Sequence, residues 1–266
     1  MSGWMNFEGH RVLVVGGTSG INLGIAETFA EQGASVAVAS RSPEKVEVAM
    51  ERLERFGRPV AGFSADVRDP ASLEAGLDAV AQRFGAIDTL IAGQAGNFPA
   101  AAMKLSPNGF KSVVDIDLLG TFNTIRLAHA HLEGRRANVI AISAPQAFIP
   151  MAFQAHVCAA KAGVEMLTRV LALELGPQNV RVNAIVPGPI ENTEGMERLA
   201  PGETLKEKVR LSVPLKRFGT ARDVANCALF LASPLAHYVN GAVIPVDGGW
   251  SVAGAGAGGG LDLSDA

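Results

Sequence analysis

The sequence predicts an α/β fold in which a parallel seven-stranded sheet is doubly wound, with helices on both of its faces. Short runs of apolar and β-branched residues alternate with longer segments of helical period, which is typical of a parallel sheet covered on both sides. The length of 266 residues and the hydrophobic fraction of 48% suffice for one large globular unit. We therefore expect a single domain over residues 1–252 and a flexible tail, rich in Gly and Ala, over residues 253–266.

The expected strands are short runs without helical period, at residues 12–15, 35–39, 59–65, 89–92, 138–143, 181–186 and 242–246. Helices are expected between them, because apolar residues recur every three or four positions, for example at Leu73, Leu77 and Val80. Further stripes of this kind contain Ile21, Ile25 and Phe29; Leu118, Phe122 and Ile125; and Val157, Val164, Leu167 and Leu171.

The longest connection follows the sixth expected strand, at residues 187–215. It combines Pro, Gly and charged residues with one short helical stretch near residues 206–211. Doubly wound sheets bind ligands in the crevice at the carboxyl ends of their strands. A long segment at this edge therefore predicts a substrate lid.

Composition and charge exclude several classes of partner. The 23 basic and 26 acidic residues give a net charge of −3, which provides no positive field for nucleic acid or a membrane surface. No apolar run reaches the roughly 20 residues of a membrane span. Cys158 and Cys227 belong to no Cys/His cluster, so we expect neither disulfides nor a metal site. The first residues lack the features of a signal peptide, and the chain does not end in the peroxisomal Ser-Lys-Leu signal, so a cytoplasmic protein is expected.

A glycine-rich turn at residues 15–24 joins the first expected strand to the first expected helix. Glycines permit a sharp turn and let backbone N–H groups approach a pyrophosphate at a helix N-terminus, where the helix dipole favours negative charge. A purely structural turn is the alternative, but the strand before it and the helix after it favour dinucleotide binding. The expected cofactor-binding residues of this turn are Gly16, Thr18, Ser19, Gly20, Ile21 and Asn22.

The end of the second expected strand indicates which nicotinamide cofactor binds. An acidic residue there would accept a hydrogen bond from the ribose 2′-OH of NAD, whereas an arginine would bind the 2′-phosphate of NADP. This chain has Ser40 and Arg41 at that point. Arg41 as a solvated loop cation is the alternative, but without a carboxylate nearby NADPH is the expected cofactor.

From about His10 to Trp250 the chain resembles the short-chain dehydrogenase/reductases, which have the Rossmann fold. The glycine turn corresponds to their TGxxxGxG motif, with Val15 in place of Thr and Asn22 in place of the last Gly. Residues 92–96 stand where their NNAG motif usually does. The resemblance implies further cofactor contacts at Asp66, Val67, Ala92, Gly93, Lys161, Pro187, Gly188, Ile190 and Thr193.

The catalytic set of this family is Asn, Ser, Tyr and Lys, with the last two spaced as YxxxK. In this chain Lys161 and Ser143 hold the family positions, while Asp117 stands at the position of the Asn. Val157 occupies the Tyr position, and the single tyrosine of the chain, Tyr238, is far away in sequence. The usual phenolic proton donor is therefore missing.

A closer resemblance is to the 2,4-dienoyl-CoA reductases, especially the peroxisomal type, which also lacks the Tyr and pairs an Asp with the Lys. It is carried by residues 95–98, 105–108, 114–117, 176–179, 187–190 and 193–195. Hydride transfer to the far carbon of a dienoyl thioester leaves a dienolate that needs a proton on carbon, so the acid must stand elsewhere than for a ketone. The resemblance implies that Asp117 orients a water that supplies this proton, and that Lys161 binds the nicotinamide ribose.

The same resemblance implies acyl-CoA contacts at Arg68, Phe98, Ser106 and Arg198, and a homotetramer built on the helices that hold Asp117 and Lys161 and on the C-terminal strand. Solvated arginines are the alternative at both arginine positions. His156 is another candidate proton donor, although a structural histidine is the commoner case.

The expected function is thus NADPH-dependent reduction of 2,4-dienoyl-CoA to 3-enoyl-CoA in unsaturated fatty acid degradation, a branch of β-oxidation. Two alternatives stay open: a reductase of a carbonyl or a 3-oxoacyl thioester, and a catalytically silent NADP-binding protein.

Overall fold

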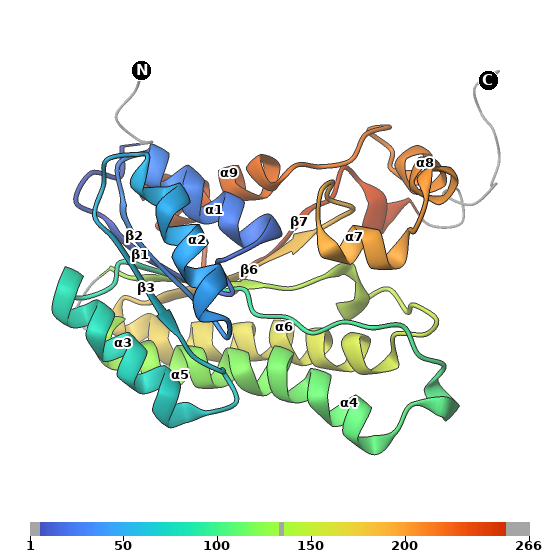
Figure 1. Cartoon of the computed structure of the whole chain (residues 1–266), viewed down its shortest axis with the longest axis horizontal. Helices are drawn as coiled ribbons and strands as arrows, with labels where there is room; N and C mark the ends of the chain where they lie inside the picture. The colour runs from blue at the N-terminus through green and yellow to red at the C-terminus, as the bar shows by residue number, and fades with distance from the viewer. Residues whose placement is uncertain (1–5, 133–135, 254–266) are drawn as a thin grey trace.

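The computed structural model describes residues 6–132 and 136–253, so residues 254–266 of the expected tail lie outside it. Within these residues, seven strands form one sheet in the order β3-β2-β1-β4-β5-β6-β7, with every neighbouring pair parallel (Figure 1). The expected doubly wound sheet is confirmed. The strand order reverses between β1 and β4, which opens a crevice beyond their carboxyl ends. The strands are β1 (Arg11–Val15), β2 (Ser35–Ser40), β3 (Val60–Ser64), β4 (Thr89–Ala92), β5 (Asn138–Ile142), β6 (Arg181–Pro187) and β7 (Val243–Val246).

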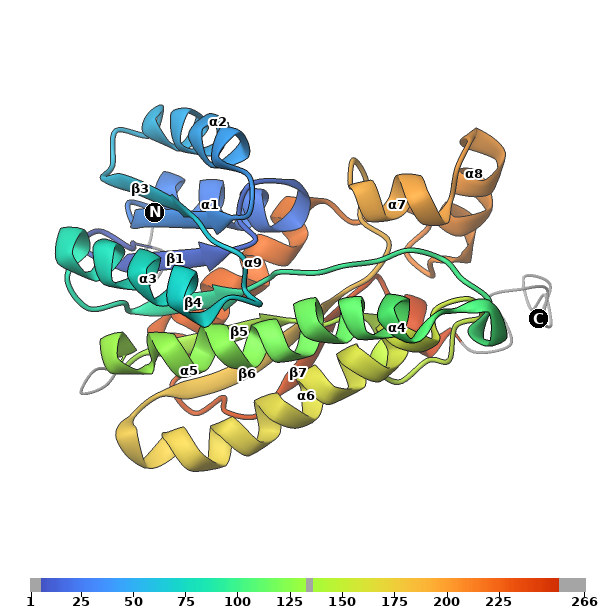
Figure 2. The same ribbon diagram turned by 60° about the horizontal axis from the view of Figure 1, so that its bottom comes forward.

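Successive side chains of each strand face opposite layers of helices. Val12 and Val14 of β1 belong to one hydrophobic core, whereas Leu13 and Val15 belong to the other, because strand side chains alternate between faces. The first core is covered by α1 (Gly20–Glu31), α2 (Pro43–Glu54) and α9 (Ala221–Ala232). The second is covered by α3 (Pro70–Phe84), α5 (Gly120–Leu132) and α6 (Ala155–Leu175), as Figures 1 and 2 show.

Local signals in the sequence fix where several helices begin. The Ser42 hydroxyl accepts a hydrogen bond from the backbone N–H of Lys45, and Pro43 follows as the first residue of α2. Thr220 and Asp223 form a reciprocal capping box at the start of α9. These caps satisfy backbone N–H groups that have no partner inside the helix.

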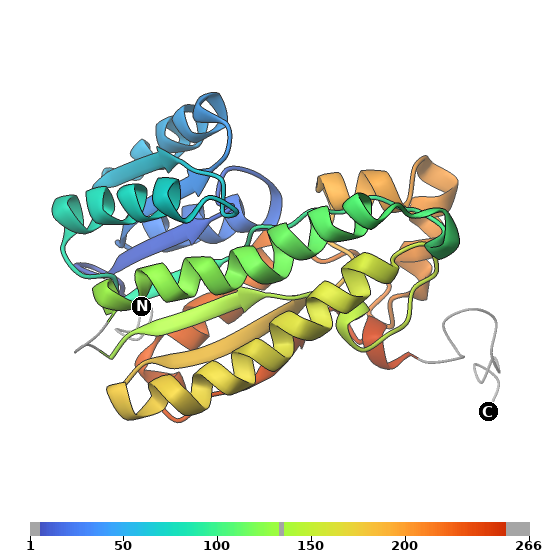
Figure 3. The same cartoon turned by 90° about the horizontal axis from the view of Figure 1, so that it is seen from below.

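One long bent helical rod crosses beneath the sheet and carries Asp117. It consists of α4 (Pro107–Val114), a π-helical turn at Asp115–Leu119, and α5 (Figure 3). The rod lies beside α6, and α4 and the π-helical turn both contact that helix. Single π-helical turns are rare and frequently occur at functional sites. The sequence predicted a helix here but gave no sign of the wider turn.

The segment 187–215 contains two helices, α7 (Glu194–Leu199) and α8 (Glu203–Ser212). The expected helical stretch at residues 206–211 lies within α8, whereas α7 was not predicted. With six residues and Gly195 near its start, α7 is too short to give a periodic signal. Both helices stand beyond the carboxyl ends of the strands (Figures 1 and 2).

Among the described residues, no helix combines the length and the apolarity needed to cross a membrane. Cys158 and Cys227 are both free thiols. Burial raises the pKa of the Cys227 thiol to about 11.

Candidate active site

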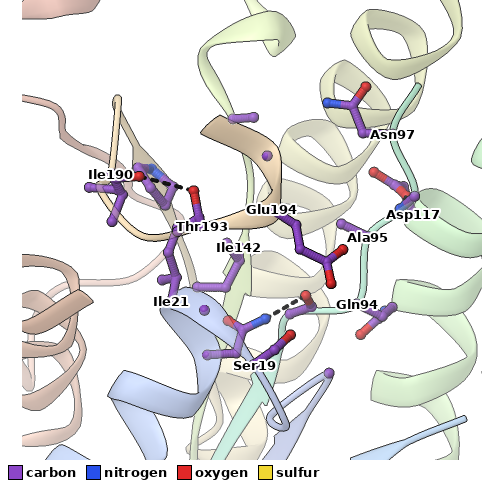
Figure 4. A pocket seen from close by; sticks show the side chains of 18 of the residues that line it. Ser19, Ile21, Gln94, Ala95, Asn97, Asp117, Ile142, Ile190, Thr193 and Glu194 are labelled. Carbon is purple, nitrogen blue, oxygen red and sulfur yellow. Dashed lines mark hydrogen bonds between the residues drawn. The ribbon is translucent and has the colours of Figure 1, made fainter. Parts of the chain in front are cut away.

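A cleft of about 750 Å³ lies at the carboxyl ends of the strands, between the glycine turn and the segment that holds α7 and α8. In Figure 4, Ser19 and Ile21 stand on one side of the cleft, Thr193 and Glu194 reach in from α7 and the residues before it, and Asp117 lies across from them. Of the expected site residues, the following line the cleft: Gly16, Thr18, Ser19, Gly20, Ile21, Asn22, Ser40, Arg41, Asp66, Val67, Gly93, Asp117, Ser143, Lys161, Pro187, Gly188, Ile190, Thr193 and Arg198.

Residue 16 of the glycine turn must be a glycine for two reasons, its backbone conformation and the lack of space for a side chain. Gly16 has φ of +79°, a conformation that side chains disfavour, and a Cβ there would lie 2.9 Å from the backbone of Gly93 and Gln94. Gly20 has φ of +53° where α1 begins. Ser19 is the N-cap of α1 but makes no capping hydrogen bond, so its side chain does not occupy the first N–H groups of the helix. This end of the cleft is therefore shaped to receive an anion at a helix N-terminus.

Asn22 ties the glycine turn to the end of β4. Its side-chain Nδ2 donates to the carbonyl oxygen of Gly93 at 2.7 Å, while its Oδ1 is buried without a partner. Residue 93 must be a glycine for this bond to form, because a Cβ there would collide with Asn22 Nδ2. The sequence gave no signal for this bond, which joins residues far apart in the chain.

Two cations and one carboxylate mark the side of the cleft at the end of β2. Arg41 and Lys45 both line the cleft, and Lys45 is a residue that sequence reasoning missed. Asp66 also lines it, but its carboxylate is held by the Arg68 guanidinium, with a shortest contact of 2.6 Å. This hydrogen bond lowers the pKa of Asp66 and raises that of Arg68. Arg68 is consequently engaged at Asp66 and is not among the residues that line the cleft.

The centre of the cleft holds a buried ion pair. The Asp117 side chain is fully buried, and its Oδ1 accepts a hydrogen bond from the backbone N–H of Gly96 at 2.6 Å. Its Oδ2 lies 3.3 Å from Lys161 Nζ but makes no hydrogen bond. Lys161 Nζ donates instead to the carbonyl oxygen of Ile142 at 2.9 Å. Each buried charge thus has an opposite charge beside it, and one oxygen of the Asp117 carboxylate has no hydrogen-bond partner among the described residues.

Ser143 forms a hydrogen bond with a second buried carboxylate, that of Glu165. Its hydroxyl donates to Glu165 Oε1 at 3.0 Å, and Glu165 in turn lies 3.5 Å from the exposed guanidinium of Arg169. A hydroxyl has one proton to donate. Ser143 therefore presents only acceptor lone pairs to the cleft.

No phenol stands near this centre. Val157, at the family Tyr position, is buried and lines the cleft, whereas Tyr238 is fully exposed. His156 is completely buried, and neither of its ring nitrogens has a hydrogen-bond partner among the described residues. Its ring packs on Phe98, with 4.6 Å between ring centroids, and does not line the cleft.

The remaining expected substrate residues divide between the cleft and its surroundings. Arg198 lines the cleft, donates to the carbonyl oxygen of Asn97 at 3.0 Å and pairs with Glu194 at 3.1 Å. Ser106 instead caps α4 through the N–H of Gly109. Four expected site residues do not line the cleft: Arg68, Ala92, Phe98 and Ser106.

The residues of the cleft fit a nicotinamide dinucleotide. A glycine cradle faces a helix N-terminus at one end, cations stand at the end of β2, and a buried lysine stands at the centre. Gln94 supports this fit, because its buried side-chain Oε1 lines the cleft without a partner while its Nε2 donates to Thr121 at 2.9 Å.

Two relatives of known name are similar over most of their length. A peroxisomal 2,4-dienoyl-CoA reductase of Pongo abelii is 45% identical over 89% of this chain and 82% of its own. A peroxisomal 2,4-dienoyl-CoA reductase of Saccharomyces cerevisiae is 41% identical over 91% of this chain and 84% of its own. Both are described as producing (3E)-enoyl-CoA.

Solved structures agree with the fold. A short-chain dehydrogenase of Bacillus anthracis has a TM-score of 0.83 and 36% identity, over 91% of this chain and 96% of its own. A short-chain dehydrogenase of Burkholderia cenocepacia, solved in complex with NADP, has a TM-score of 0.83 and 27% identity, over 91% of this chain and 98% of its own.

These relatives overturn the expectation of a cytoplasmic location, because both curated relatives are peroxisomal enzymes. The expectation rested on the lack of signal-peptide features and of the Ser-Lys-Leu signal, and these do not decide the compartment. Targeting signals are short addresses read by receptors, and they leave no trace in the packed domain.

The glycine cradle, the buried lysine and the parallel sheet agree with a family model described as enoyl-(acyl carrier protein) reductase, which matches residues 15–251. The chain belongs to the short-chain dehydrogenase/reductase family, whose Rossmann fold binds a nicotinamide cofactor.

Proposed function

We propose that the protein reduces a 2,4-dienoyl-CoA thioester to the 3-enoyl-CoA with NADPH, a step in the degradation of unsaturated fatty acids. The observation that carries the proposal is the buried pair of Asp117 and Lys161 in a cleft without a phenol. The named relatives, at 41% and 45% identity, support the same chemistry.

The residues proposed to hold NADPH follow the cleft from end to end. The glycine turn and the first N–H groups of α1 bind the pyrophosphate. Arg41 binds the 2′-phosphate with help from Lys45, which also lines the cleft. Asp66 and Val67 contact the adenine, and Lys161 binds the nicotinamide ribose. Thr193, whose hydroxyl donates to the carbonyl oxygen of Ile190 at 2.9 Å, holds the segment beside the nicotinamide.

Bound NADPH supplies the hydride, which the conjugated thioester accepts at its far carbon, C5. The negative charge spreads as a dienolate, and C2 must then take a proton. Oδ2 is the oxygen of the Asp117 carboxylate that has no hydrogen-bond partner among the described residues, so it accepts a hydrogen bond from the water that donates this proton. The hydroxide that remains takes up a proton from solvent, which restores the water. The Lys161 ammonium stabilises the negative charge as it develops.

Ser143 is not proposed to donate a hydrogen bond to a carbonyl oxygen of the substrate. Because the Ser143 hydroxyl donates its hydrogen bond to Glu165, its oxygen can only accept a hydrogen bond from a ligand or a water in the cleft. In this proposal its lone pairs accept from another donor in the cleft, because the proton-donating water has one O–H on Asp117 and the other directed at C2.

The segment 187–215 is proposed as the substrate lid of a single domain over residues 1–252. Its helix α7 is tied across the cleft, because Glu194 approaches Lys45 at 3.8 Å and Arg198 bonds the backbone of Asn97. Both ties are exposed ion pairs or surface hydrogen bonds, which contribute little to stability and break easily. Arg198 is then available to a phosphate of the CoA group.

A homotetramer built on the rod that carries Asp117, on α6 and on the C-terminal strand is part of the proposal. Several apolar side chains on the first two elements are exposed in the single chain: Leu119, Phe122, Met166, Val170 and Leu173. Adjacent exposed apolar residues of this kind mark interfaces between subunits. Light scattering coupled to gel filtration checks the proposal, and a monomer at micromolar concentration contradicts it.

The first test is NADPH oxidation with a medium-chain 2,4-dienoyl-CoA, compared with a 3-oxoacyl-CoA and with NADH. Turnover of the dienoyl thioester with formation of the 3-enoyl product supports the proposal. Reduction of the 3-oxoacyl thioester alone identifies a carbonyl reductase, and tight NADPH binding without reduction of either identifies a silent binding protein.

The cofactor is tested with Arg41→Asp, which we expect to weaken NADPH binding by at least tenfold and to spare NADH. Arg55→Asp is the matched control, because Arg55 is an exposed arginine paired with Glu27 and does not line the cleft. Unchanged NADPH affinity in Arg41→Asp contradicts the assignment of the 2′-phosphate.

A further inference from the structure

Several apolar side chains that line the cleft have no role in the mechanism above, and five of them come from segments at one end of the cleft. They are Met151, Leu199, Ala200, Val209 and Trp250, which we call the apolar compartment. They come from the loop before α6, from the end of α7, from α8 and from the residues after β7. Figures 1, 2 and 3 place these segments at one end of the molecule.

The compartment differs from the charged part of the cleft in its residue types. The cations that line the cleft are Arg41, Lys45, Lys161 and Arg198, among the residues the structure describes. None of the five compartment residues is polar apart from the indole N–H of Trp250. Phe98 and Ser106, which were expected to contact the acyl-CoA, are not among the residues that line the cleft.

Trp250 is fixed at both its side chain and its backbone. Its indole Nε1–H donates to the Ser212 hydroxyl at 3.0 Å, and that hydroxyl donates to the carbonyl oxygen of Val209 at 2.6 Å. The Asp247 carboxylate accepts from the N–H groups of Gly249 and Ser251, at 2.9 and 2.8 Å, on either side of Trp250. The indole is therefore a preorganised wall, because moving it breaks several hydrogen bonds at once.

The turn before Trp250 also connects this wall to the proposed lid. The backbone N–H of Leu215 donates to the carbonyl oxygen of Gly248 at 3.2 Å, and Gly248 has φ of +64°. A Cβ on Gly248 would lie 2.7 Å from the Val213 side chain. The residues that follow α8 are thus packed directly on the turn that presents Trp250.

We propose that the apolar compartment binds the acyl chain of a fatty acyl thioester and that the Trp250 indole limits the chain length accepted. The identity of the thioester head rests on the proposed function, but chain binding does not require turnover. Each methylene that enters the compartment raises affinity by about fourfold, until the chain meets the indole.

The first experiment uses Trp250 as its own reporter. The chain has two tryptophans, and Trp4 lies outside the described residues, so Trp4→Phe leaves Trp250 as the single indole. The NADP⁺-loaded variant is titrated with CoA and with saturated butanoyl- to dodecanoyl-CoA, which cannot be reduced. We expect the Trp250 emission to change with the longer chains and to stay constant with CoA. An equal response to CoA and to all chain lengths, or no response to any, overturns the proposal.

The second experiment compares chain-length profiles of binding. In the wild type, affinity for saturated acyl-CoA rises with length and then stops rising or falls. Trp250→Ala is expected to shift this limit to longer chains, and Trp250→Phe to shift it less. Val252→Ala is the matched control, because Val252 is exposed and belongs to the same segment. A limit that is identical in all variants contradicts the proposal.

Ser212→Ala tests whether the indole must be held in place. It keeps the ring but removes its hydrogen bond, so we expect a less sharp limit at the same length. Circular dichroism melting checks that each variant is folded. If Trp250→Ala does not fold, the shift of the length limit is measured with Trp250→Phe alone.

The outcomes separate this inference from the proposed function. If dienoyl-CoA is not reduced but the binding limit follows residue 250, the inference stands and the proposed function fails. If dienoyl-CoA is reduced while Trp250→Ala leaves the length limit unchanged, only the inference fails.

Discussion

The two ends of the cleft are built in different ways. At the glycine turn the ligand would meet main chain, placed by glycines at Gly16 and Gly20 and by the start of α1. At the reaction centre it would meet buried side chains, the pair of Asp117 and Lys161 and the pair of Ser143 and Glu165. Main-chain geometry is encoded in one contiguous stretch, whereas each buried pair joins different elements.

The difference also affects how tolerant each end is of substitution. A backbone cradle is lost when an added atom fills its space, without any change of side-chain charge. A buried ion pair is lost when one charge is removed, because the other is left uncompensated. The following predictions separate these two kinds of failure, from the largest expected effect to the smallest.

Removing the Asp117 charge from the reaction centre is expected to have the largest effect on turnover. Asp117→Asn keeps the shape of the side chain but removes the charge, and we expect kcat to fall by about 10²- to 10⁴-fold while NADPH still binds. Steady-state kinetics and NADPH fluorescence measure the two quantities. Asp115→Asn is the control, because Asp115 lies in the same π-helical turn and pairs with Lys111. Full turnover in Asp117→Asn would remove the proposed mechanism.

Filling the glycine cradle is expected to act on binding instead of chemistry. Gly16→Ala places a Cβ against the backbone of Gly93 and Gln94, so NADPH affinity should drop by about tenfold or more. Gly9→Ala is the matched control, because Gly9 has φ of +77° against +79° for Gly16 but nothing within 4 Å of its Cβ position. Both variants lose a similar amount of stability, about 1 kcal/mol, from the backbone conformation alone. Equal NADPH affinities in the two variants contradict the cradle.

Removing the Ser143 hydroxyl is expected to cost less than tenfold in kcat. The loss of a hydrogen-bond donor to a developing oxyanion typically lowers kcat by about 10²- to 10³-fold. The Ser143 hydroxyl, however, donates its hydrogen bond to Glu165. Ser143→Ala is measured beside Asp117→Asn under the same conditions. A loss of a hundredfold or more would mean that the hydroxyl turns toward the substrate during turnover.

Strong acid is expected to weaken the start of α9, which packs against α1 at the cofactor end of the cleft. The Arg217 guanidinium beside Asp223 lowers the pKa of that carboxyl from 3.8 to about 2. A depressed pKa gives stability that is present above pH 4 and is lost as the pH falls through 2. The difference in Tm between the wild type and Asp223→Asn should therefore shrink between pH 4 and pH 2. A difference that is constant over this range contradicts the assignment.

The helical layers follow from local periodicity, whereas the contacts of the site do not. The helix stripe of Ile21, Ile25 and Phe29 is readable because local periodicity and burial coincide in one helix. Helix α7 escaped prediction because six residues give too few repeats of that period. Arg68 was expected at the substrate, but the structure pairs it with Asp66, two residues away. A charged side chain takes the partner that the local backbone offers, and a motif does not encode that choice.

By itself the sequence determined the sheet, the glycine turn, and the absence of a tyrosine from the family position at Val157. These are properties of adjacent residues or of single positions. Only the tertiary structure decided that Asp117 meets Lys161 from a π-helical turn, that the Ser143 hydroxyl donates a hydrogen bond to Glu165, and that Trp250 lines the cleft. Each of these contacts joins elements that are separate in sequence, so its geometry depends on how the helices pack on the sheet and not on any local pattern.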